Sequence, residues 1–417
     1  MARLAYSLVL WLALPLVLIR LLWRARRQPD YLAHWGERFG RYAARPTRPV
    51  LWLHAVSVGE TRAAEPLVSA LIARYPEHEL LLTCMTPTGR AAALATYGGR
   101  ATVVYLPYDY RFAVRRFLAH FRPRIGLLLE TEVWPNLLAI SVECAVPMVL
   151  VNARLSEHSA GRYRRVNALA RGAFGALVRV AAQTAADRER IIAQGATAVS
   201  VTGNLKFDAS PDPGLLALGA QWRAMVVGRR VVLAASTREG EEALLLPWIK
   251  ALAAAGHLVV LVPRHPQRFD EVAQLVAGAG LRVARRSAGA ALPAATQVWL
   301  GDSMGEMVAY YAMADCAYIG GSLLPLGGQN LIEAAACGCP ALLGPHTWNF
   351  HEAADAAVAS GAARRVADVA QLSAAVASLL ADHAARGRMV DATRAFAAAH
   401  RGATARTIAL IEPLLGG

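Results

Sequence analysis

Short apolar runs alternate with amphipathic stretches along most of the chain, and this alternation predicts an α/β fold with parallel sheets. In the first half we expect strands at Val50–Val56, Leu80–Cys84, Thr102–Tyr105, Ile125–Leu129, Met148–Val151 and Val180–Ala182. The second half repeats the plan, with strands expected at Val231–Ala235, Leu258–Val262, Val298–Leu300, Cys316–Ile319 and Ala341–Leu343.

The two series of strands predict two domains. The stretch FDASPDPG at residues 207–214 is rich in turn residues and predicts a linker, which we place at 209–228. The chain has 417 residues, enough for two ordinary cores, so we expect domains over 49–208 and 229–417. Ligands of open α/β sheets bind beyond the carboxyl ends of the strands. Two such sheets that face each other would form a cleft.

The N-terminus carries the longest apolar run, Leu4–Ile19, between Arg3 and Arg20. As a helix it would be roughly 24 Å long, slightly short of a bilayer core, although flanking arginines can snorkel. We expect a membrane anchor over 1–22; a helix that lies in the interface and a merely buried helix are the alternatives. The arginines that follow the run favour a cytoplasmic body and argue against a cleaved signal peptide.

Residues 23–48 alternate arginines with aromatic residues, which predicts a basic segment on anionic headgroups; a solvated linker is the alternative. The net charge of +14 also indicates an anionic partner: nucleic acid, an anionic membrane or a phosphorylated substrate. The five cysteines show no zinc spacing, and we expect them to be reduced and buried. We expect no metal and no cofactor.

The segment GGSLLPLGGQNLIEAAACGCPALLGP, residues 320–345, is the most informative part of the chain. It predicts a glycine-rich loop, a helix that begins near Asn330 with Glu333 in its first turn, and an apolar strand. Unpaired N–H groups and the helix dipole at such a start favour a phosphate. The Glu333 carboxylate could accept hydrogen bonds from the two hydroxyls of a ribose. A glycine-rich turn before an ordinary core helix is the alternative.

Three candidate residues follow strands in the first half. Glu60 of HAVSVGE is expected at a helix start, where the dipole keeps it ionised and available as a base; a helix-capping glutamate is the alternative. In ETEVWPN, Glu130 and Glu132 stand at an apolar strand end, where a charge must be used or paired. One of them could pair with Arg154, which would leave the other for catalysis.

Lys206 stands in TGNLKFD, just before the predicted linker. The chain holds 44 basic residues, and only Lys206 and Lys250 are lysines. A compact ammonium at this place could meet a negative charge that develops in a reaction, and a solvated surface lysine is the alternative.

Two loops in the second half could bind a nucleotide. VPRHPQRF, residues 262–269, places Arg264 between prolines, where its fork can bind a phosphate or a carboxylate. GDSMGEM, residues 301–307, offers Gly305 for close backbone approach and Glu306 as an acceptor for a nucleobase.

Taken together, HAVSVGE, CMTPTG, YLPYD, ETEVWPN, NARLS, GNLKFD, VPRHPQRF, GDSMGEM and GGQNLIEA resemble the 3-deoxy-D-manno-octulosonic acid (Kdo) transferases of lipopolysaccharide assembly. The resemblance covers nearly the whole chain. It implies the GT-B fold, two Rossmann-like domains with the active site between them. It also implies transfer of Kdo from CMP-Kdo to the 6′-hydroxyl of the tetraacyl lipid A precursor, with inversion, on the cytoplasmic face of the inner membrane.

The resemblance also assigns roles to residues. Glu60 matches the proton acceptor of the family, and Glu130 and Lys206 match its transition-state residues. The CMP contacts of the family match Pro263, Arg264, Met304, Gly305, Glu306, Asn330, Leu331, Ile332 and Glu333. Cys84 and Gln329 depart from the usual threonine and from the histidine of some members, and neither is a catalytic position.

The expected partners are the donor CMP-Kdo, an anionic lipid acceptor and a membrane surface. A transferase that uses a UDP-sugar is the nearest alternative, and competition between CMP and UDP would separate the two. A non-catalytic lipid-binding protein is a second alternative, against which the presence of Glu60, Glu130 and Lys206 argues. Nucleic acid is not expected, because aromatic residues and arginines alternate only near the N-terminus.

Overall fold

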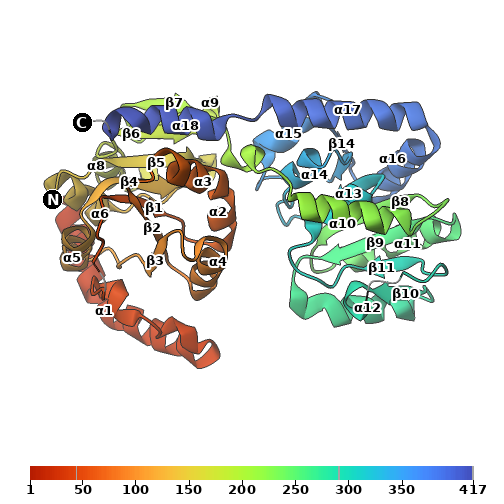
Figure 1. Ribbon diagram of the computed structural model, residues 1–417, viewed down its shortest axis with the longest axis horizontal. Coiled ribbons are helices and arrows are strands. Elements are labelled where there is room, and N and C mark those ends of the chain that lie inside the picture. The colour runs from red at the N-terminus through yellow and green to blue at the C-terminus, as the bar shows by residue number, and fades with distance from the viewer. Residues whose placement is uncertain (44, 290–291, 416–417) are drawn as a thin grey trace. The chain divides into compact units, whose positions relative to one another are not determined.

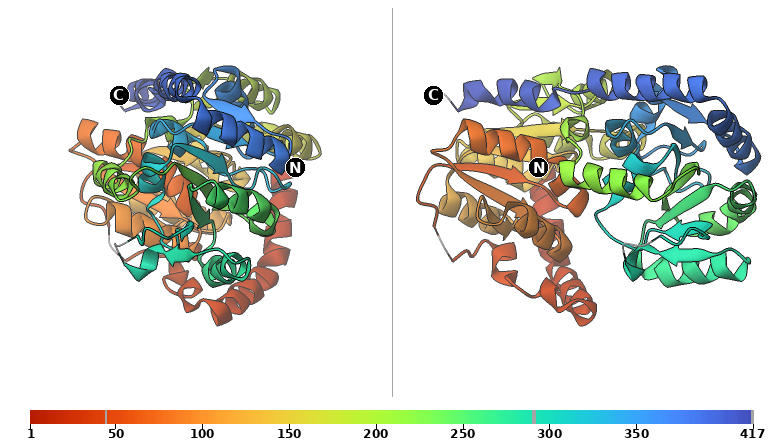
Figure 2. Two further views of the ribbon diagram at one scale, coloured as in Figure 1. Left: turned by 90° about the vertical axis from the view of Figure 1, so that its right-hand side faces the viewer. Right: turned by 45° about the vertical axis from the view of Figure 1, so that its right-hand side comes forward.

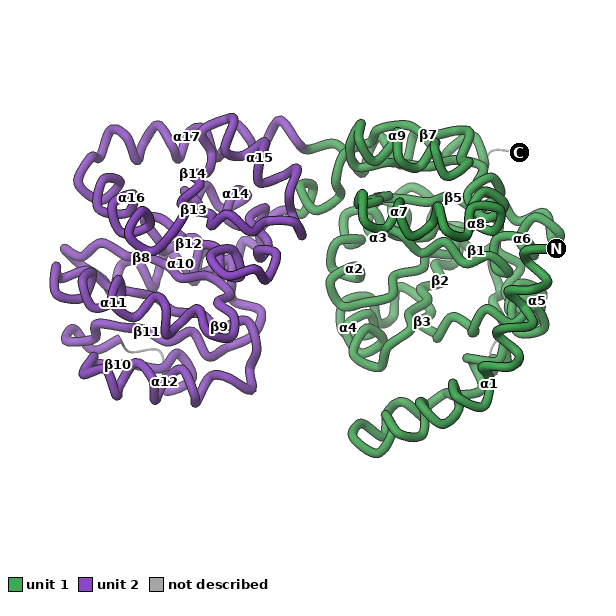
Figure 3. Tube along the Cα trace, turned by 180° about the vertical axis from the view of Figure 1, so that it is seen from behind, with its two compact units in different colours: residues 1–209, 401–417 green, residues 210–400 purple. Residues whose placement is uncertain are grey.

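The computed structural model describes residues 1–43, 45–289 and 292–415, which form two compact units. Unit 1 comprises residues 1–209 and 401–417, and unit 2 comprises residues 210–400 (Figure 3). Each unit is built on a seven-stranded sheet in which every pairing is parallel. Helices flank both sheets (Figures 1 and 2).

The sheet of unit 1 has the order β3-β2-β1-β4-β5-β6-β7. Its strands are β1 (Val50–His54), β2 (Glu79–Cys84), β3 (Thr102–Tyr105), β4 (Pro123–Leu129), β5 (Met148–Ala153), β6 (Arg179–Ala182) and β7 (Val199–Val201). Its helices are α1 (Ala2–Arg27), α2 (Val58–Ala63), α3 (Glu65–Arg74), α4 (Pro87–Tyr97), α5 (Arg111–Phe121), α6 (Pro135–Glu143), α7 (Glu157–Arg164), α8 (Asn167–Phe174), α9 (Ala185–Ala193) and α18 (Ala403–Ile411).

The central strands of unit 1 are buried on both faces. In β1, Val50 and Trp52 point into one apolar cluster, whereas Leu51 and Leu53 point into a second cluster on the other face. This alternation follows from the two-residue period of a strand and explains why such strands have continuous apolar sequences.

The sheet of unit 2 has the order β10-β11-β9-β8-β12-β13-β14. Its strands are β8 (Val231–Thr237), β9 (Leu258–Pro263), β10 (Val283–Arg285), β11 (Val298–Leu300), β12 (Cys316–Ile319), β13 (Ala341–Leu343) and β14 (Ala363–Arg365). Its helices are α10 (Pro213–Ala224), α11 (Glu241–Ala254), α12 (Phe269–Gly278), α13 (Met307–Met313), α14 (Ile332–Ala336), α15 (His351–Ala359), α16 (Val369–Ala381) and α17 (His383–Ala399). The predicted class, two parallel α/β domains, is confirmed.

The boundaries of the units differ from the prediction in two places. Residues 209–228 were expected to be a linker, but they contain α10, which belongs to unit 2 and places Trp222 4.9 Å from Trp299 between ring centroids. Residues 401–417 were expected in the second domain, but they group with unit 1, where Ala403 and Ile411 of α18 join the same apolar cluster as Leu53.

The N-terminal helix is longer than predicted. It runs from Ala2 to Arg27, so several arginines assigned to the basic segment 23–48 lie on the helix itself. Its length and composition would allow it to cross a membrane. One arginine of the segment does not face outward, because Arg38 is buried over the ring of Tyr105 and donates to the Met85 carbonyl at 3.1 Å. For Arg38 the prediction of a headgroup contact is wrong.

Candidate active site

Three residues at or just beyond the carboxyl ends of strands have left-handed backbones although they are not glycines. These are Glu130 after β4, Asn152 near the end of β5 and Ser236 near the end of β8, with φ values of 58°, 52° and 54°. Left-handed backbones are uncommon for such residues, and they occur often at functional sites. Two left-handed positions of unit 1, Glu130 and Asn152, therefore lie at the sheet edge that the sequence indicated.

Glu60 is held in place by its own loop. Ser57 is the N-cap of α2, and its hydroxyl donates to one carboxylate oxygen of Glu60 at 2.9 Å, while the Val56 N–H donates to the other at 2.8 Å. These bonds cap the start of α2, so Glu60 is in part a helix-capping glutamate, as the alternative interpretation of the sequence held. Burial is the main cause of a net rise in the pKa of Glu60 to about 7; the nearby charge of Glu130 adds to the rise, and the bonds from Val56 and Ser57 oppose it. A carboxylate with this pKa is suited to accept a proton near neutrality.

Glu130 and Lys206 form an ion pair in unit 1. The Lys206 Nζ lies 3.4 Å from the Glu130 Oε1, and both side chains are partly exposed. The sequence placed both residues at this site but did not predict the pair. Pairing of Glu130 or Glu132 with Arg154 stays a prediction.

Glu132 and His54 are in more apolar surroundings. Burial raises the pKa of Glu132, and its carboxylate accepts from the Trp134 indole at 2.7 Å. His54 ends β1 and is fully buried beside Trp134, and burial lowers its pKa to about 4. His54 is therefore neutral near pH 7.

The sequence did not single out Asn152, which connects the parts of the unit 1 site. Its side-chain oxygen accepts from the Leu205 N–H at 3.0 Å, next to Lys206, and the carbonyl of neighbouring Val151 accepts from the Glu130 N–H at 3.0 Å. The only sequence signal is an asparagine near a strand end, a residue type that tolerates a left-handed backbone.

In unit 2, a buried ion pair fixes the loop after β9. Arg268 binds both carboxylate oxygens of Glu242, at 2.8 and 2.9 Å, and both side chains are buried. Pro263 is the buried last residue of β9, and Arg264 is exposed, with its backbone N–H bonded to the Thr237 carbonyl. The guanidinium of Arg264 is therefore available to an anion on a loop of defined position.

The loop before α13 contains the second group of predicted residues. Gly305 has a φ of 86°, and the side chain of Met304 is exposed. Glu306 is already bonded to two side chains, Arg286 at 2.9 Å and the Ser303 hydroxyl. A base contact made by Glu306 would share or replace one of these bonds.

The glycine-rich segment forms a loop and a short helix, as predicted, but α14 begins at Ile332 and has 5 residues. The Ile332 N–H is bonded to the Asn330 side chain at 3.0 Å, so it does not belong to the unpaired N–H groups that the sequence indicated. Leu331 and Ile332 are buried, whereas Glu333 is exposed and accepts from the Asn330 amide at 3.1 Å. Of this group, the side chains of Asn330 and Glu333 are placed to meet a ligand.

Glu241 is a second residue that the sequence did not single out. It is fully buried at the start of α11 and accepts from the Gly321 N–H and the Tyr318 hydroxyl, each at 2.5 Å, and from the Arg238 N–H at 2.9 Å. It thereby ties the loop after β8 to the glycine-rich loop. The signal available in the sequence was a pair of adjacent glutamates, Glu241 and Glu242, directly after Gly240.

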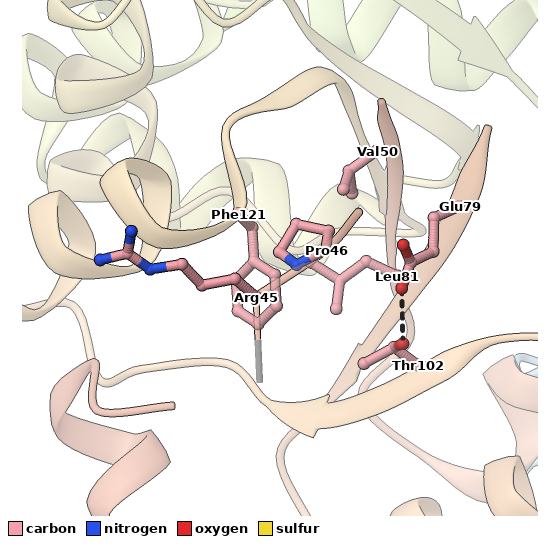
Figure 4. Close-up of a pocket in the computed structure, with 7 residues that line it drawn as sticks. All are labelled: Arg45, Pro46, Val50, Glu79, Leu81, Thr102 and Phe121. Carbon is pink, nitrogen blue, oxygen red and sulfur yellow. Dashed lines mark hydrogen bonds between the residues drawn. The ribbon is translucent and has the colours of Figure 1, made fainter. Parts of the chain in front are cut away.

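A separate small hollow lies at the other edge of the unit 1 sheet (Figure 4). It is lined by Arg45, Pro46, Val50, Glu79, Leu81, Thr102 and Phe121, among which Thr102 donates to Glu79 at 3.3 Å. Val50, Glu79 and Thr102 begin β1, β2 and β3, so the hollow is at the amino ends of the strands and is not the candidate site. Within the described ranges, no three His, Cys, Asp or Glu side chains cluster in a way that could hold a metal ion.

Comparisons with known proteins agree with this division into units. A family model described as 3-Deoxy-D-manno-octulosonic-acid transferase (kdotransferase) matches residues 33–209, and a model described as Glycosyl transferases group 1 matches residues 254–396. The chain is 47% identical over 431 residues to a 3-deoxy-D-manno-octulosonic acid transferase of Bordetella pertussis, with 100% of both chains covered. It is 35% identical over 426 residues to the protein of that name from Haemophilus influenzae, covering 100% of this chain and 99% of the relative.

A solved structure supports the fold. The structure of a glycosyltransferase from Rickettsia africae ESF-5 superposes with a TM-score of 0.61 at 11% identity, and the match covers 89% of this chain and 100% of that chain. The two parallel-sheet units thus define a glycosyltransferase of the GT-B class. Within that class, the chain belongs to the family of 3-deoxy-D-manno-octulosonic acid transferases.

Proposed function

We propose that this protein transfers Kdo from CMP-Kdo to the 6′-hydroxyl of the tetraacyl lipid A precursor, a step of lipopolysaccharide biosynthesis. Family membership supports the transfer of Kdo. The choice of donor and acceptor rests on the motifs from HAVSVGE to GGQNLIEA and on the net charge of +14, which suits an acceptor with phosphates. We place the reaction on the cytoplasmic face of the inner membrane, as the resemblance of these motifs to the Kdo transferases implies.

Glu60 is the proposed general base, and its raised pKa of about 7 is the observation that carries the proposal. Glu60 removes the proton of the acceptor hydroxyl, and the resulting oxygen nucleophile attacks the anomeric carbon of Kdo. The bond between that carbon and the phosphate oxygen breaks, and CMP leaves with the bonding electron pair. Attack from the side opposite the leaving group inverts the anomeric centre.

The remaining residues bind and stabilise charge. Lys206, held by Glu130 at 3.4 Å, is placed to meet negative charge on the reacting sugar or the departing phosphate. In unit 2, we assign the CMP moiety to the loops that carry Arg264, Gly305 and Glu333. The resemblance to the family adds Pro263, Met304, Glu306, Asn330, Leu331 and Ile332 to this proposed nucleotide site.

Replacement of the base tests the proposal. Glu60→Gln keeps the size of the side chain and an acceptor for the Val56 N–H, so we expect it to fold and to bind CMP normally. Turnover, measured as CMP release from CMP-Kdo with the lipid acceptor, should fall by at least ~10²-fold. Glu65→Gln, at a partly exposed glutamate of α3 that accepts from Ser69, is the matched control and should be fully active. Near-normal turnover of Glu60→Gln would refute the assignment.

A transferase that uses a UDP-sugar remains the second candidate, because the GT-B fold serves several nucleotide donors. Competition distinguishes the two. If the donor is CMP-Kdo, CMP should inhibit turnover and bind to the protein, whereas UDP at the same concentration should do neither.

A further inference from the structure

The first turns of α1 present one side to the rest of unit 1, and its last turns lie against the segment that follows the helix, where Arg24 stands over the ring of Tyr31. The residues on this inner face recur at intervals of three and four and are buried or half-buried: Arg3, Tyr6, Ser7, Leu10, Ala13, Leu14, Val17, Leu18, Leu21, Arg24 and Ala25. Such spacing is that of a helix packed against a protein surface. In Figure 1 the first turns of α1 lie beside α5 and α6.

Polar bonds fix the first turns of this inner face. The Tyr6 hydroxyl donates to the Asp109 carboxylate at 3.0 Å, and the Ser7 hydroxyl donates to the Asn136 side chain at 3.1 Å. The Tyr110 hydroxyl donates to the Leu10 carbonyl at 2.9 Å. These contacts join α1 to the loop before α5 and to the start of α6.

Asp109 is part of the core of unit 1 and not a surface group. It is 4% exposed and accepts from the backbone N–H groups of Asn136 and Leu137 at 3.0 and 2.7 Å, which caps the N-terminus of α6. Asn136 is 1% exposed. Tyr6 and Ser7 therefore bond to residues that cannot leave their positions without unfolding α6.

The opposite side of α1 is apolar and exposed. This outer face consists of Leu4, Leu8, Val9, Leu12, Leu16, Ile19, Leu22 and Trp23; Trp11, although exposed in part, packs beside Tyr110 and Phe112. Leu32 and Trp35 extend the exposed apolar surface beyond the helix, and basic residues gather at its C-terminal end: Arg20, Arg24, Arg26 and Arg27. An apolar face with arginines and tryptophans beside it is typical of a surface that enters an anionic bilayer.

We infer that α1 does not cross the bilayer but lies in its interface, with the outer face in the acyl region and the inner face on unit 1. The inference takes one element from the proposed function: the surface that the outer face contacts is an anionic lipid bilayer. The distance from Tyr6 to Arg24 along the helix is about 27 Å. A spanning α1 would carry Tyr6 across the hydrocarbon, away from Asp109, or would draw α5 and α6 into it. Moving Tyr6 away would leave the buried Asp109 carboxylate without one of its hydrogen-bond donors. Drawing α5 and α6 into the hydrocarbon would expose folded polar surface to lipid.

Determining on which side of the membrane the N-terminus lies tests the inference. An Ala2→Cys variant is expressed in bacteria, which are converted to spheroplasts and treated with a membrane-impermeant maleimide. Native Cys144, which was expected to be buried but is exposed on unit 1, is the internal reference for the side on which the body lies. We expect the new thiol and Cys144 both to be protected in intact spheroplasts and both to react after permeabilisation. Reaction of the new thiol in intact spheroplasts, with Cys144 still protected, would show that α1 spans and would overturn the inference.

A second test addresses the outer face. Leu8→Glu combined with Leu12→Glu should lower the partition of the purified protein onto phosphatidylglycerol vesicles by roughly tenfold or more, because both side chains would leave the acyl region. Leu94→Glu combined with Val201→Glu, at exposed apolar positions of α4 and β7, is the matched control and should bind as wild type. Equal binding of both variants would contradict the inference.

The vesicle measurement is independent of the reaction, because the vesicles contain neither donor nor acceptor. Failure of the proposed function would therefore leave vesicle binding unchanged. Conversely, the Leu8 and Leu12 variant should keep its turnover on an acceptor dispersed in detergent.

Discussion

Glu60 has two properties that a general base requires, a fixed position and a pKa near the working pH. Ser57 and Val56 fix the carboxylate, and burial raises its pKa to about 7. The base acts when ionised, so kcat/KM should fall about tenfold per pH unit below pH 7 and level off above it. A pH profile of the wild-type enzyme checks this. A rate that stays flat down to pH 5 would contradict the role of Glu60.

The same pKa shift has a consequence for stability. A carboxyl whose pKa is higher in the folded state stabilises the fold below its unfolded pKa, near 4.5, and this contribution is lost as the pH rises to 7. Glu60→Gln should therefore be more stable than wild type at pH 8, by about 1–3 kcal/mol, with no such gain at pH 4.5. Urea unfolding at both pH values measures the difference.

Substitutions of Lys206 test whether turnover requires a compact ammonium at this position. Lys206→Ala removes the charge beside Glu130, and Lys206→Arg keeps the charge but changes its size and hydration. Both variants should lower turnover, Ala more than Arg. Lys250→Ala is the matched control, because Lys250 is the other lysine of the chain and is exposed on α11. Wild-type turnover in both Lys206 variants would make Lys206 an ordinary surface residue.

Glu333 is the exposed carboxylate of the proposed nucleotide site. Glu333→Ala should weaken CMP binding by about 1–3 kcal/mol, the cost of a lost hydrogen bond to a charged group. Calorimetry with CMP measures the change, and Glu352→Ala, at a partly exposed glutamate of α15, is the control. Unchanged affinity for CMP would place the nucleotide elsewhere.

At the scale of elements, the sequence predicted eleven of the strands that the structure describes and missed three, β7, β10 and β14. Each missed strand has 3 residues and lies at the edge of its sheet, where the side chains are partly exposed. An edge strand is paired on one side only, so its sequence need not be continuously apolar. The signal that identified the other strands was therefore weak or absent.

The candidate site was predictable where a charged residue follows a strand, as for Glu60, Glu130, Arg264 and Glu333. Residues that act through buried contacts were not predictable. The local sequence signals of Asn152 and Glu241 are weak, because the partners of these side chains are distant in the sequence: Leu205 for one, Gly321 for the other. Arg38 was misassigned for the same reason, since nothing near it indicates that Tyr105 covers it.

The ion pair between Arg268 and Glu242 supports the loop after β9. Arg268→Ala would leave Glu242 buried without its cation, so we expect a loss of about 3–5 kcal/mol in the free energy of unfolding. Denaturant unfolding measures the loss. Arg264→Ala, four residues earlier and exposed, is the control and should leave stability within about 0.5 kcal/mol of wild type. Equal stability of the two variants would contradict the structural role of Arg268.

At the scale of the whole molecule, the chain leaves unit 1 near residue 209 and returns to it at residue 401. The carboxylate of Asp208 accepts from the N–H groups of Gly402 and Thr404 at 2.6 and 2.5 Å, and Arg406 donates to the Thr202 carbonyl. These bonds join α18 to residues 202–208, among the last residues of unit 1 before the chain enters unit 2. The sequence of α18 is that of an ordinary amphipathic helix, so the unit that it joins could not be inferred from it.

The most direct test of the account is mass spectrometry of the product formed by purified protein, CMP-Kdo and the tetraacyl lipid A precursor. We expect a lipid heavier by whole Kdo units, with one CMP released for each unit, and at least ~10²-fold slower product formation when Glu60 is replaced by Gln. A lipid of unchanged mass from folded, CMP-binding protein would contradict the proposed reaction. The same reaction with a UDP-sugar in place of CMP-Kdo should leave the lipid unchanged, and a lipid that gains a sugar from the UDP donor would also contradict the proposed reaction.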